Sequence, residues 1–455
     1  MSKHPSLAAL AALVAPPAGS PLWRKDFVFG SGTSSYQIEG AAFEGGRLPS
    51  IWDTFCATPG KVLRGENGDV ACDHYHRFDE DVALMADLGL DAYRFSIAWP
   101  RVMDETGRPN AKGIDFYKRL LDSLERRGIK AYVTLYHWDL PQHLEDRGGW
   151  LNRELAYRFA DYADLMTREL RGRVAAWATF NEPWCSAYLG YGNGHHAPGH
   201  AQLRWGAQAM HHHLLAHGLA LPAMRANAPG AQHGLVANVS PAYPVTPADT
   251  RAVALFNAYQ NAWVLDPLLR GEYPADLWAL WPGCEPLVLI DDMATIAQPL
   301  DYLGLNYYSR AVVRSTGPDS FTWVHPEGVE RTTMDWEVYP QGLQDILEQF
   351  KRDYAKLPPL VITENGCASQ DEVDASGQVD DTQRQTYVRR HLEALSRAMQ
   401  NGVDVRGYFV WSLLDNFEWA FGYERRFGLV HVDFETQRRT PKLSALAYAN
   451  FLRQR

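Results

Sequence analysis

The segment Pro359-Leu-Val-Ile-Thr-Glu364-Asn-Gly366 contains a short apolar strand that ends in a carboxylate. Leu360–Ile362 is the continuous apolar run expected of a strand buried on both faces. Asn365 and Gly366 are turn residues, so the strand ends there. A carboxylate at the end of a buried strand is costly to desolvate, so Glu364 needs a partner or a function. An incidental acidic residue at the start of a loop fits this stretch equally well.

Strand-like segments recur along the chain, and most are followed by a helical pattern of apolar residues. Strands that alternate with amphipathic helices predict βα units and a parallel sheet. Eight units predict an α/β fold, a single (β/α)8 TIM barrel with elaborated βα loops; an open, doubly wound sheet is the alternative. The predicted strands are Phe27–Gly30, Ala92–Ile97, Ala131–Tyr136, Ala175–Phe180, Gly234–Val239, Tyr302–Asn306, Leu360–Thr363 and Arg406–Trp411.

The chain of 455 residues is 46% hydrophobic, and we expect one catalytic domain over residues 21–455. Residues 1–20 are predicted to be a disordered extension. Lys3 followed by Leu7–Ala15 faintly resembles a signal peptide, but the run is mostly alanine and Pro16-Pro17 stands at the expected cleavage position. A cytoplasmic location is therefore favoured over a periplasmic or secreted one. Residues 315–339 are predicted to form a long loop, and residues 368–381 an exposed one.

Composition excludes several classes of partner. Lys and Arg total 44 against 54 Asp and Glu, a net charge of −10, and no basic run suits a nucleic acid. No apolar run approaches the ~18–20 residues of a membrane span. The five cysteines are odd in number and scattered, which predicts free thiols without a zinc site. Consecutive helical residues point in different directions, so His211–His213 is not expected to bind a metal. We expect a small-molecule substrate and no cofactor or metal; the oligomeric state stays open.

Polar and aromatic residues follow the carboxyl ends of the predicted strands. In a closed parallel barrel these ends meet at one rim, where the chemistry of such barrels gathers. The rim residues are Gln37, Arg94, His137, Trp138, Asn181, Glu182, Asn306, Tyr307, Tyr308, Glu364 and Trp411, with Glu418 and Trp419 in the last loop.

Glu182 and Glu364 end the fourth and seventh predicted strands and therefore face one another across the mouth. Paired carboxylates beside a sugar pocket are the minimum apparatus for glycoside hydrolysis. A gap of about 5–5.5 Å leads to retention of configuration, and about 6.5–9.5 Å leads to inversion. Sequence spacing leaves that gap open.

Several motifs together resemble those of glycoside hydrolase family one, the retaining β-glucosidase family. The resemblance extends from Phe27 to Tyr448, and so many motifs in order are very specific. They are Thr179-Phe-Asn-Glu-Pro183, Ile362-Thr-Glu-Asn-Gly366, Ser34-Ser-Tyr-Gln-Ile-Glu-Gly40, Trp411-Ser-Leu-Leu-Asp-Asn-Phe-Glu-Trp419, Tyr136-His-Trp-Asp139 and Gly304-Leu-Asn-Tyr-Tyr308.

The resemblance implies roles for the rim residues. Glu182 would be the acid/base and Glu364 the nucleophile, held ionised by Arg94 and Tyr308. Trp336, in the long loop, would be a wall for the leaving group or equally a loop anchor. The other implied substrate-binding residues are Gln37, His137, Trp138, Asn181 (at the 2-hydroxyl), Asn306, Tyr308, Trp411 (the floor), Glu418 and Trp419.

The resulting functional hypothesis is a retaining β-D-glucosidase of cellulose degradation. It would act on terminal β-D-glucosyl residues of cello-oligosaccharides and of aryl or alkyl β-glucosides through a covalent glycosyl-enzyme. The Glu418 carboxylate would repel a sugar 6-phosphate, which disfavours a phospho-glycosidase. A β-galactosidase or β-fucosidase of the same family is the alternative. A sugar-binding barrel without catalysis is disfavoured, because binding alone does not require two opposed carboxylates.

Overall fold

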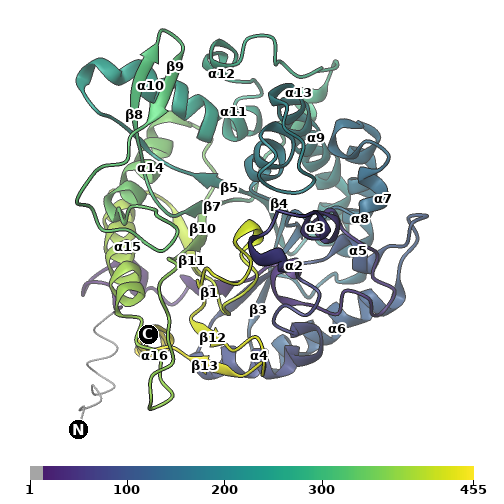
Figure 1. Cartoon of the computed structure of the whole chain (residues 1–455), viewed down its shortest axis with the longest axis vertical. Coiled ribbons are helices and arrows are strands. Elements are labelled where there is room, and N and C mark those ends of the chain that lie inside the picture. Colours follow the sequence, from purple (N-terminus) through teal and green to yellow (C-terminus); the bar gives the residue numbers. More distant parts are fainter. Residues whose placement is uncertain (1–13) are drawn as a thin grey trace.

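The computed structural model describes residues 14–455, and its centre is a closed ring of parallel strands (Figure 1). The order around the ring is β1-β11-β10-β7-β5-β4-β3-β2. Every predicted strand overlaps one of these, so the predicted (β/α)8 barrel is confirmed. The barrel strands are β1 (Val28–Gly32), β2 (Ala92–Ser96), β3 (Lys130–Tyr136), β4 (Ala176–Asn181), β5 (Gln232–Val239), β7 (Tyr302–Tyr307), β10 (Leu360–Asn365) and β11 (Val405–Trp411).

The first and last strands of the barrel close the ring. β1 and β11 pair in parallel from Val28 opposite Gly407 to Gly32 opposite Trp411. The Ser31 hydroxyl crosses this seam and donates to the carbonyl of Val410 at 2.9 Å. The seam therefore joins residues that are 379 positions apart in the chain.

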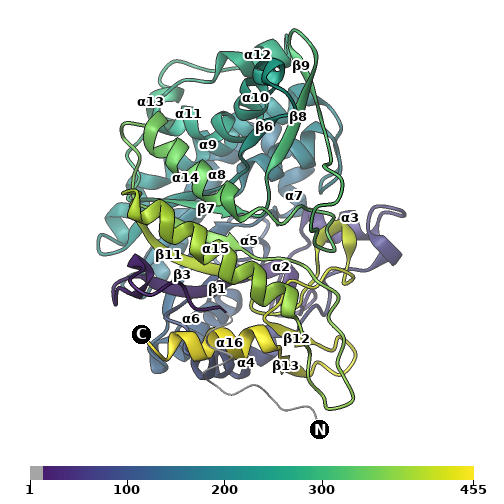
Figure 2. The ribbon, with the colours of Figure 1, turned by 90° about the vertical axis from the view of Figure 1, so that its left-hand side faces the viewer.

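Helices surround the ring with their apolar faces turned inward. In α6 the residues Ile114, Tyr117, Leu121 and Leu124 are buried at the i, i+3, i+7, i+10 spacing of one helix face. Figure 2 shows α14, α15 and α16 packed along one side of the molecule. The longer helices are α4 (His74–Leu88), α6 (Ala111–Arg126), α8 (Glu154–Glu169), α9 (Leu203–Asn227), α14 (Pro340–Asp353), α15 (Thr382–Gln400) and α16 (Leu443–Leu452).

Shorter elements elaborate the loops. The short helices are α2 (Ser35–Ile38), α3 (Ile51–Ala57), α5 (Trp99–Val102), α7 (Gln142–Glu145), α10 (Thr250–Asn257), α11 (Trp263–Leu269), α12 (Ala275–Leu280) and α13 (Asp292–Ile296). One small sheet contains β6 (Ala242–Pro244), β8 (Ala311–Gly317) and β9 (Ser320–Trp323), and another contains β12 (Val430–Val432) and β13 (Arg439–Pro441).

The prediction that residues 315–339 form one long loop is wrong at the start of this segment. Gly317-Pro318-Asp319 turns the chain there, and β9 returns antiparallel to β8.

A separate cluster fills the barrel interior. It takes one side chain from each of six barrel strands: Ala92, Tyr132, Ala176, Tyr302, Val361 and Phe409. Tyr132 and Phe409 belong to strands that are not neighbours, yet their ring centroids lie 4.9 Å apart. The interior is therefore packed, and a cavity can open only toward an end of the barrel.

The loop after β10 is held by buried ion pairs. Arg384 donates to Asp371 at 2.7 Å and to Asp381 at 2.5 Å, and all three side chains are fully buried. Lys442 also donates to Asp371, at 2.6 Å. The prediction that residues 368–381 are exposed is therefore wrong at Asp371 and Asp381, because cations from α15 and from the segment before α16 hold these two carboxylates inside.

The predicted N-terminal extension lies partly outside the described residues, which begin at Val14. Within the described part, Val14 is buried against the main core and Ser20 caps the turn Pro21–Trp23. Ordered structure therefore begins earlier than residue 21. Between residues 14 and 455, no helix is both long enough and apolar enough to cross a membrane.

Candidate active site

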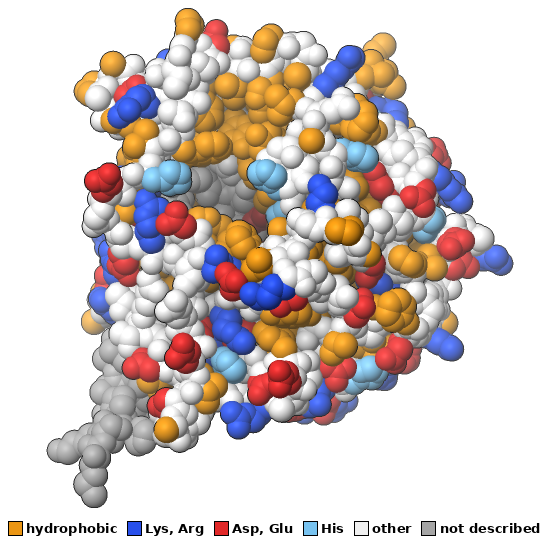
Figure 3. All heavy atoms as spheres, in the orientation of Figure 1, with side chains coloured by type: hydrophobic (Ala, Val, Ile, Leu, Met, Phe, Trp, Pro, Cys, Tyr) orange, Lys and Arg blue, Asp and Glu red, His pale blue; other side chains and the backbone are white. Residues whose placement is uncertain are grey.

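The rim residues meet around a cavity of about 640 Å³. Figure 3 shows a hollow on this face of the molecule, bordered by hydrophobic side chains. Most of the predicted site residues line the cavity: His137, Trp138, Asn181, Glu182, Asn306, Tyr308, Trp336, Glu364, Trp411, Glu418 and Trp419. Gln37 and Arg94 do not line it and act on residues that do.

Glu364, on β10, is buried and has two strong partners. Arg94 on β2 donates to its Oε1 at 2.6 Å, and the Tyr308 hydroxyl donates to its Oε2 at 2.6 Å. Burial raises the pKa of Glu364, whereas the Arg94 guanidinium and the Tyr308 hydroxyl both lower it. Glu364 is therefore the carboxylate that this site equips to carry a negative charge.

Glu182 directly follows β4 and has only neutral partners. The Asn306 amide donates to its Oε1 at 2.7 Å, and the Cys185 thiol donates to its Oε2 at 3.0 Å. Burial and the negative charge of Glu364 raise the pKa of Glu182 to about 7. The backbone of Glu182 is left-handed, with φ of +47°, which costs about 1–2 kcal/mol in a residue with a Cβ. The turn out of β4 thus aims this side chain back over the barrel mouth.

Two asparagine amides between the carboxylates have fixed orientations. Thr363 donates to Asn306 Oδ1 at 2.7 Å, so the Asn306 NH2 group must face Glu182. Arg94 donates to Asn181 Oδ1 at 2.6 Å, so the Asn181 NH2 group faces His137 Nε2, at 3.1 Å. Strand residues that hydrogen-bond across β2, β4, β7 and β10 therefore preorganise the site without a ligand.

His137 is a neutral imidazole with one free donor. Its Nε2 accepts from Asn181, so the proton lies on Nδ1, which has no protein partner among residues 14–455. Burial and the Arg94 charge hold the pKa of His137 well below its ordinary value. The ring stacks against Trp411 and Trp419, with centroids 5.8 and 5.9 Å away. Because Nδ1 itself is fully buried, His137 lines the cavity with the rest of its ring, beside the flat faces of Trp411 and Trp419.

Glu418 is the third buried carboxyl of the cavity. Burial and the charges of Glu364 and Glu182 raise its pKa to about 8. The Gln37 amide donates to it at 3.3 Å, and also to the carbonyl of Phe417 at 2.9 Å and to Asn416 at 3.0 Å. Gln37 thus lies behind Glu418 and hydrogen-bonds to the last loop. It was expected on the cavity wall, as a direct sugar ligand, but it does not line the cavity.

The remaining tryptophans form the walls. Trp138 packs against Trp419 with ring centroids 4.5 Å apart and the rings tilted by 38°, and it donates its Nε1–H to the carbonyl of Asn181 at 2.9 Å. Trp336 is half-buried and lines the cavity. It packs between Tyr308 and Phe427, with ring centroids 5.2 and 6.1 Å away. Trp336 therefore anchors its loop and faces the cavity at once.

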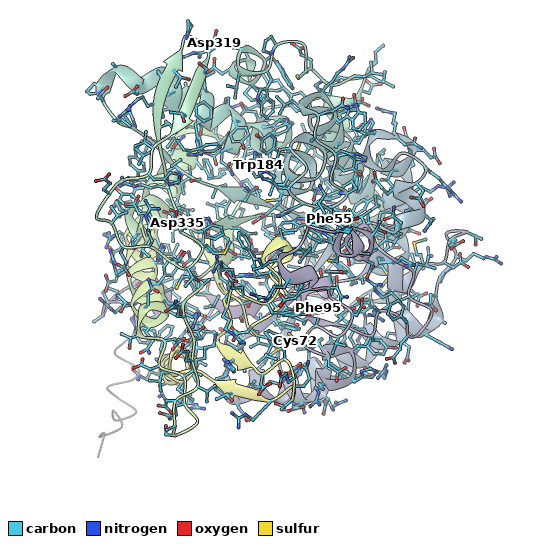
Figure 4. The ribbon with its side chains drawn as sticks, in the orientation of Figure 1. Phe55, Cys72, Phe95, Trp184, Asp319 and Asp335 are labelled. Atoms are coloured by element: carbon cyan, nitrogen blue, oxygen red, sulfur yellow. The ribbon has the colours of Figure 1, made fainter. Side chains whose placement is uncertain are left out.

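Sequence reasoning missed part of the site. Cys185 opens the π-helical segment Cys185–Gly192, and its three-residue spacing from Glu182 was the available signal. The outer cavity is lined by Trp184 after β4, Phe256 on α10 and Trp323 on β9. Trp184, labelled in Figure 4, lies above the barrel opening in that view. These side chains make the outer cavity largely apolar.

The three consecutive histidines of α9 diverge. The His211 ring hydrogen-bonds to Asp292 at 3.0 Å, and the His212 ring to the carbonyl of Trp150 at 2.8 Å. The His213 ring hydrogen-bonds to the carbonyl of Ala209, one turn earlier in α9. Across residues 14–455 no group of three or more His, Cys, Asp or Glu side chains is placed to hold a metal ion.

Comparison with known proteins identifies close relatives along nearly the whole chain. The model of glycosyl hydrolase family 1 matches residues 20–455. The chain is 44% identical to β-glucosidase A of Acetivibrio thermocellus, over 94% of this chain and 98% of the relative. It is 47% identical to a bifunctional β-D-glucosidase/β-D-fucosidase of Bifidobacterium breve, over 95% and 98%. The crystal structure of a psychrophilic β-glucosidase from Micrococcus antarcticus, 45% identical, superposes with a TM-score of 0.92 over 95% of this chain and 97% of the other.

Proposed function

Because the chain belongs to glycosyl hydrolase family 1 and is thus a glycoside hydrolase, we propose that it is a retaining β-D-glucosidase with Glu364 as nucleophile and Glu182 as acid/base. The observation that carries this proposal is the unequal surroundings of two carboxyls in one cavity. Glu364 has a cation and a phenol at 2.6 Å, whereas Glu182 has an amide and a thiol. Environments that push two pKa values apart assign the acid and the base.

In the first step Glu364 attacks the anomeric carbon and the bond to the leaving group breaks. Protonated Glu182 gives its proton to the departing glycosidic oxygen, which leaves as an alcohol. The products are a glycosyl ester on Glu364 and an ionised Glu182. A pKa near 7 for Glu182 matches proton donation close to neutral pH.

In the second step the ester on Glu364 no longer carries the charge that raised the pKa of Glu182. Ionised Glu182 takes a proton from water, the hydroxide adds to the anomeric carbon, and the bond to Glu364 breaks. Glu364 is again a carboxylate, and the sugar leaves with the configuration of the substrate. One charge thus switches Glu182 from acid to base.

The sugar would lie on Trp411, with its hydroxyls toward His137, Asn181, Glu418 and Trp419. Asn181 is proposed for the 2-hydroxyl, where contacts strengthen in the transition state. The His137 ring and the Glu418 carboxyl are two polar groups that line the cavity. Gln37 would act on the sugar through Glu418.

We propose aryl and alkyl β-glucosides and cello-oligosaccharides as substrates, in cellulose degradation. The apolar outer walls Trp184, Phe256 and Trp323, together with Trp336, favour aromatic or apolar leaving groups. A β-fucosidase activity is the second candidate, because the relative from Bifidobacterium breve is named for both activities.

The test is release of nitrophenol from aryl β-glucoside, β-galactoside and β-fucoside by wild-type protein and by Glu364→Ala. We expect turnover of the glucoside by wild type and a loss of many orders of magnitude in the variant. NMR of the first-formed sugar should show the β-anomer. Sugar binding without turnover by wild type would instead support a non-catalytic barrel, and a first-formed α-anomer would refute retention.

A further inference from the structure

The proton of neutral Glu182 belongs on one of its two carboxyl oxygens and not on the other. The Asn306 NH2 group faces Oε1 at 2.7 Å, and Thr363 prevents this amide from turning over. An N–H donor facing Oε1 makes that oxygen an acceptor in both protonation states. The proton of neutral Glu182 therefore belongs on Oε2.

The protein group in contact with Oε2 is the thiol of Cys185. Its Sγ lies 3.0 Å from Oε2, and the Cys185 N–H donates to the Glu182 carbonyl at 2.9 Å, so the two residues are joined in one turn. Cys185 is buried, and both burial and the Glu182 charge raise the pKa of its thiol well above the ordinary value. It remains a neutral S–H group and neither ionises nor attacks the sugar.

We propose that Cys185 is a positioning residue that holds the proton-transferring oxygen of Glu182 and sets how readily that oxygen gives up and regains its proton. The proposal rests on the acid/base role of Glu182. A thiol is a weak donor and a weak acceptor, so it supports ionised Oε2 without preventing its protonation. A cation in the same place would keep Glu182 ionised and abolish the acid.

The contact should matter in both half-reactions. The thiol lowers the pKa of Glu182, opposing burial and Glu364. Loss of the donor destabilises the ionised form, so the pKa of Glu182 rises. Its proton is then retained to higher pH in the first step, and the base of the second step is formed less readily at a given pH.

The charged and titratable groups that face Glu182 from neighbouring elements are Arg94 on β2, Tyr308 after β7, Glu364 on β10 and Glu418 in the last loop. None of them hydrogen-bonds to the Cys185 side chain. A change at Cys185 therefore alters one partner of Glu182 and leaves these four in place.

The test compares Cys185→Ala, Cys185→Val and Cys185→Ser with wild type and with Cys72→Ala. Cys72 is the matched control, because it is also a buried thiol that donates one hydrogen bond, to the carbonyl of Asp415 at 3.1 Å. Figure 4 shows it well away from Trp184, the neighbour of Cys185. Val fills the space without a donor and decides the question if the Ala variant does not fold.

Two readouts separate positioning from packing. For an alkyl glucoside, the alkaline limb of kcat/KM should move up by about half to one pH unit in the Ala and Val variants, the size expected of one weak hydrogen bond. For dinitrophenyl glucoside, kcat on its acidic limb, at pH values below the pKa of Glu182 in the glycosyl-enzyme, should fall about three- to tenfold. Its kcat/KM should stay within twofold, because this leaving group needs no proton. Ser should recover most of both effects, and Cys72→Ala should show neither.

Unshifted limbs in both the Ala and Val variants, or equal losses in kcat and kcat/KM, would overturn the role of Cys185. The role of Glu182 is tested separately with Glu182→Gln. If that variant loses equal activity on alkyl and dinitrophenyl glucosides, the acid/base assignment fails. If it discriminates between them while the Cys185 variants do not shift, only the present inference fails.

Discussion

Glu418→Gln should stabilise the fold, and increasingly so as the pH rises. Glu418 is 9% exposed and has one hydrogen-bond donor, Gln37, at 3.3 Å, with no cation. Burial and the neighbouring carboxylates raise its pKa from 4.5 to about 8. The unfolded chain releases this proton near pH 4.5 and the folded chain near pH 8. Folding stability is therefore lost as the pH rises through that window.

The size of the effect follows from the two pKa values of Glu418. Each pKa unit corresponds to about 1.4 kcal/mol, so the destabilisation is on the order of 1 kcal/mol at pH 5 and 3 kcal/mol at pH 7. Glutamine has no charge to bury, and its amide oxygen can still accept from Gln37. Between pH 5 and pH 7 the variant should gain about 2–3 kcal/mol relative to wild type, or roughly 2–3 °C in Tm for a chain of this length.

The assay is thermal and urea unfolding of both proteins at pH 5 and pH 7, followed by tryptophan fluorescence. Glu337→Gln is the control, since Glu337 is equally buried but accepts two hydrogen bonds from the Arg310 guanidinium, both at 2.9 Å. That variant should lose stability at both pH values. If the free energy of unfolding changes equally between pH 5 and pH 7 in wild type and in Glu418→Gln, Glu418 is already ionised in the folded protein and its pKa is not raised.

Three further predictions concern catalysis. Since Glu182 must be protonated in the first step, kcat/KM for an alkyl glucoside should fall above about pH 7; a flat profile to pH 9 would contradict it. Arg94→Lys keeps the positive charge but cannot donate to Glu364 and Asn181 at once, so kcat/KM should drop about 10²–10³-fold while circular dichroism shows an intact fold. Activity near that of wild type would show that the charge alone suffices. Trp336→Ala should raise KM for aryl glucosides about three- to tenfold more than for methyl glucoside; equal increases would mean that Trp336 acts only on its loop.

The barrel and the membership of its rim could be predicted because both depend on local pattern. The apolar run before Glu364 and the seven others like it specify buried parallel strands, and closure of the ring brings their carboxyl ends together whatever the loops do. Strand ends therefore pointed to cavity-lining residues such as Glu182, Asn306, Glu364 and Trp411. The alternation of strands and amphipathic helices along the chain also accounts for the closing pair β1 and β11, the outer helices and the packed barrel interior.

Contacts that depend on side-chain direction could not be predicted. Gln37 was expected on the sugar, but the last loop folds over it and takes its amide protons. Cys185 reaches Glu182 only because the left-handed turn at Glu182 leads into a π-helical segment. The start of the predicted long loop forms a hairpin instead. Its signals were the Pro318-Asp319 turn and the alternation of polar and aromatic residues in Ser320-Phe-Thr-Trp323, which is only four residues long.

The seam between β1 and β11 constrains how the protein is made. Its partners are 379 residues apart, so β1 has no ladder partner on that side until nearly the whole chain has left the ribosome. Non-local pairing of this kind raises contact order, slows folding and leaves strand edges open to aggregation. During translation the nascent β1 and β2 pair would wait with one edge unpaired. Chaperone occupancy and expression yield should therefore respond more to changes near this seam than to changes of equal size in the middle of the ring.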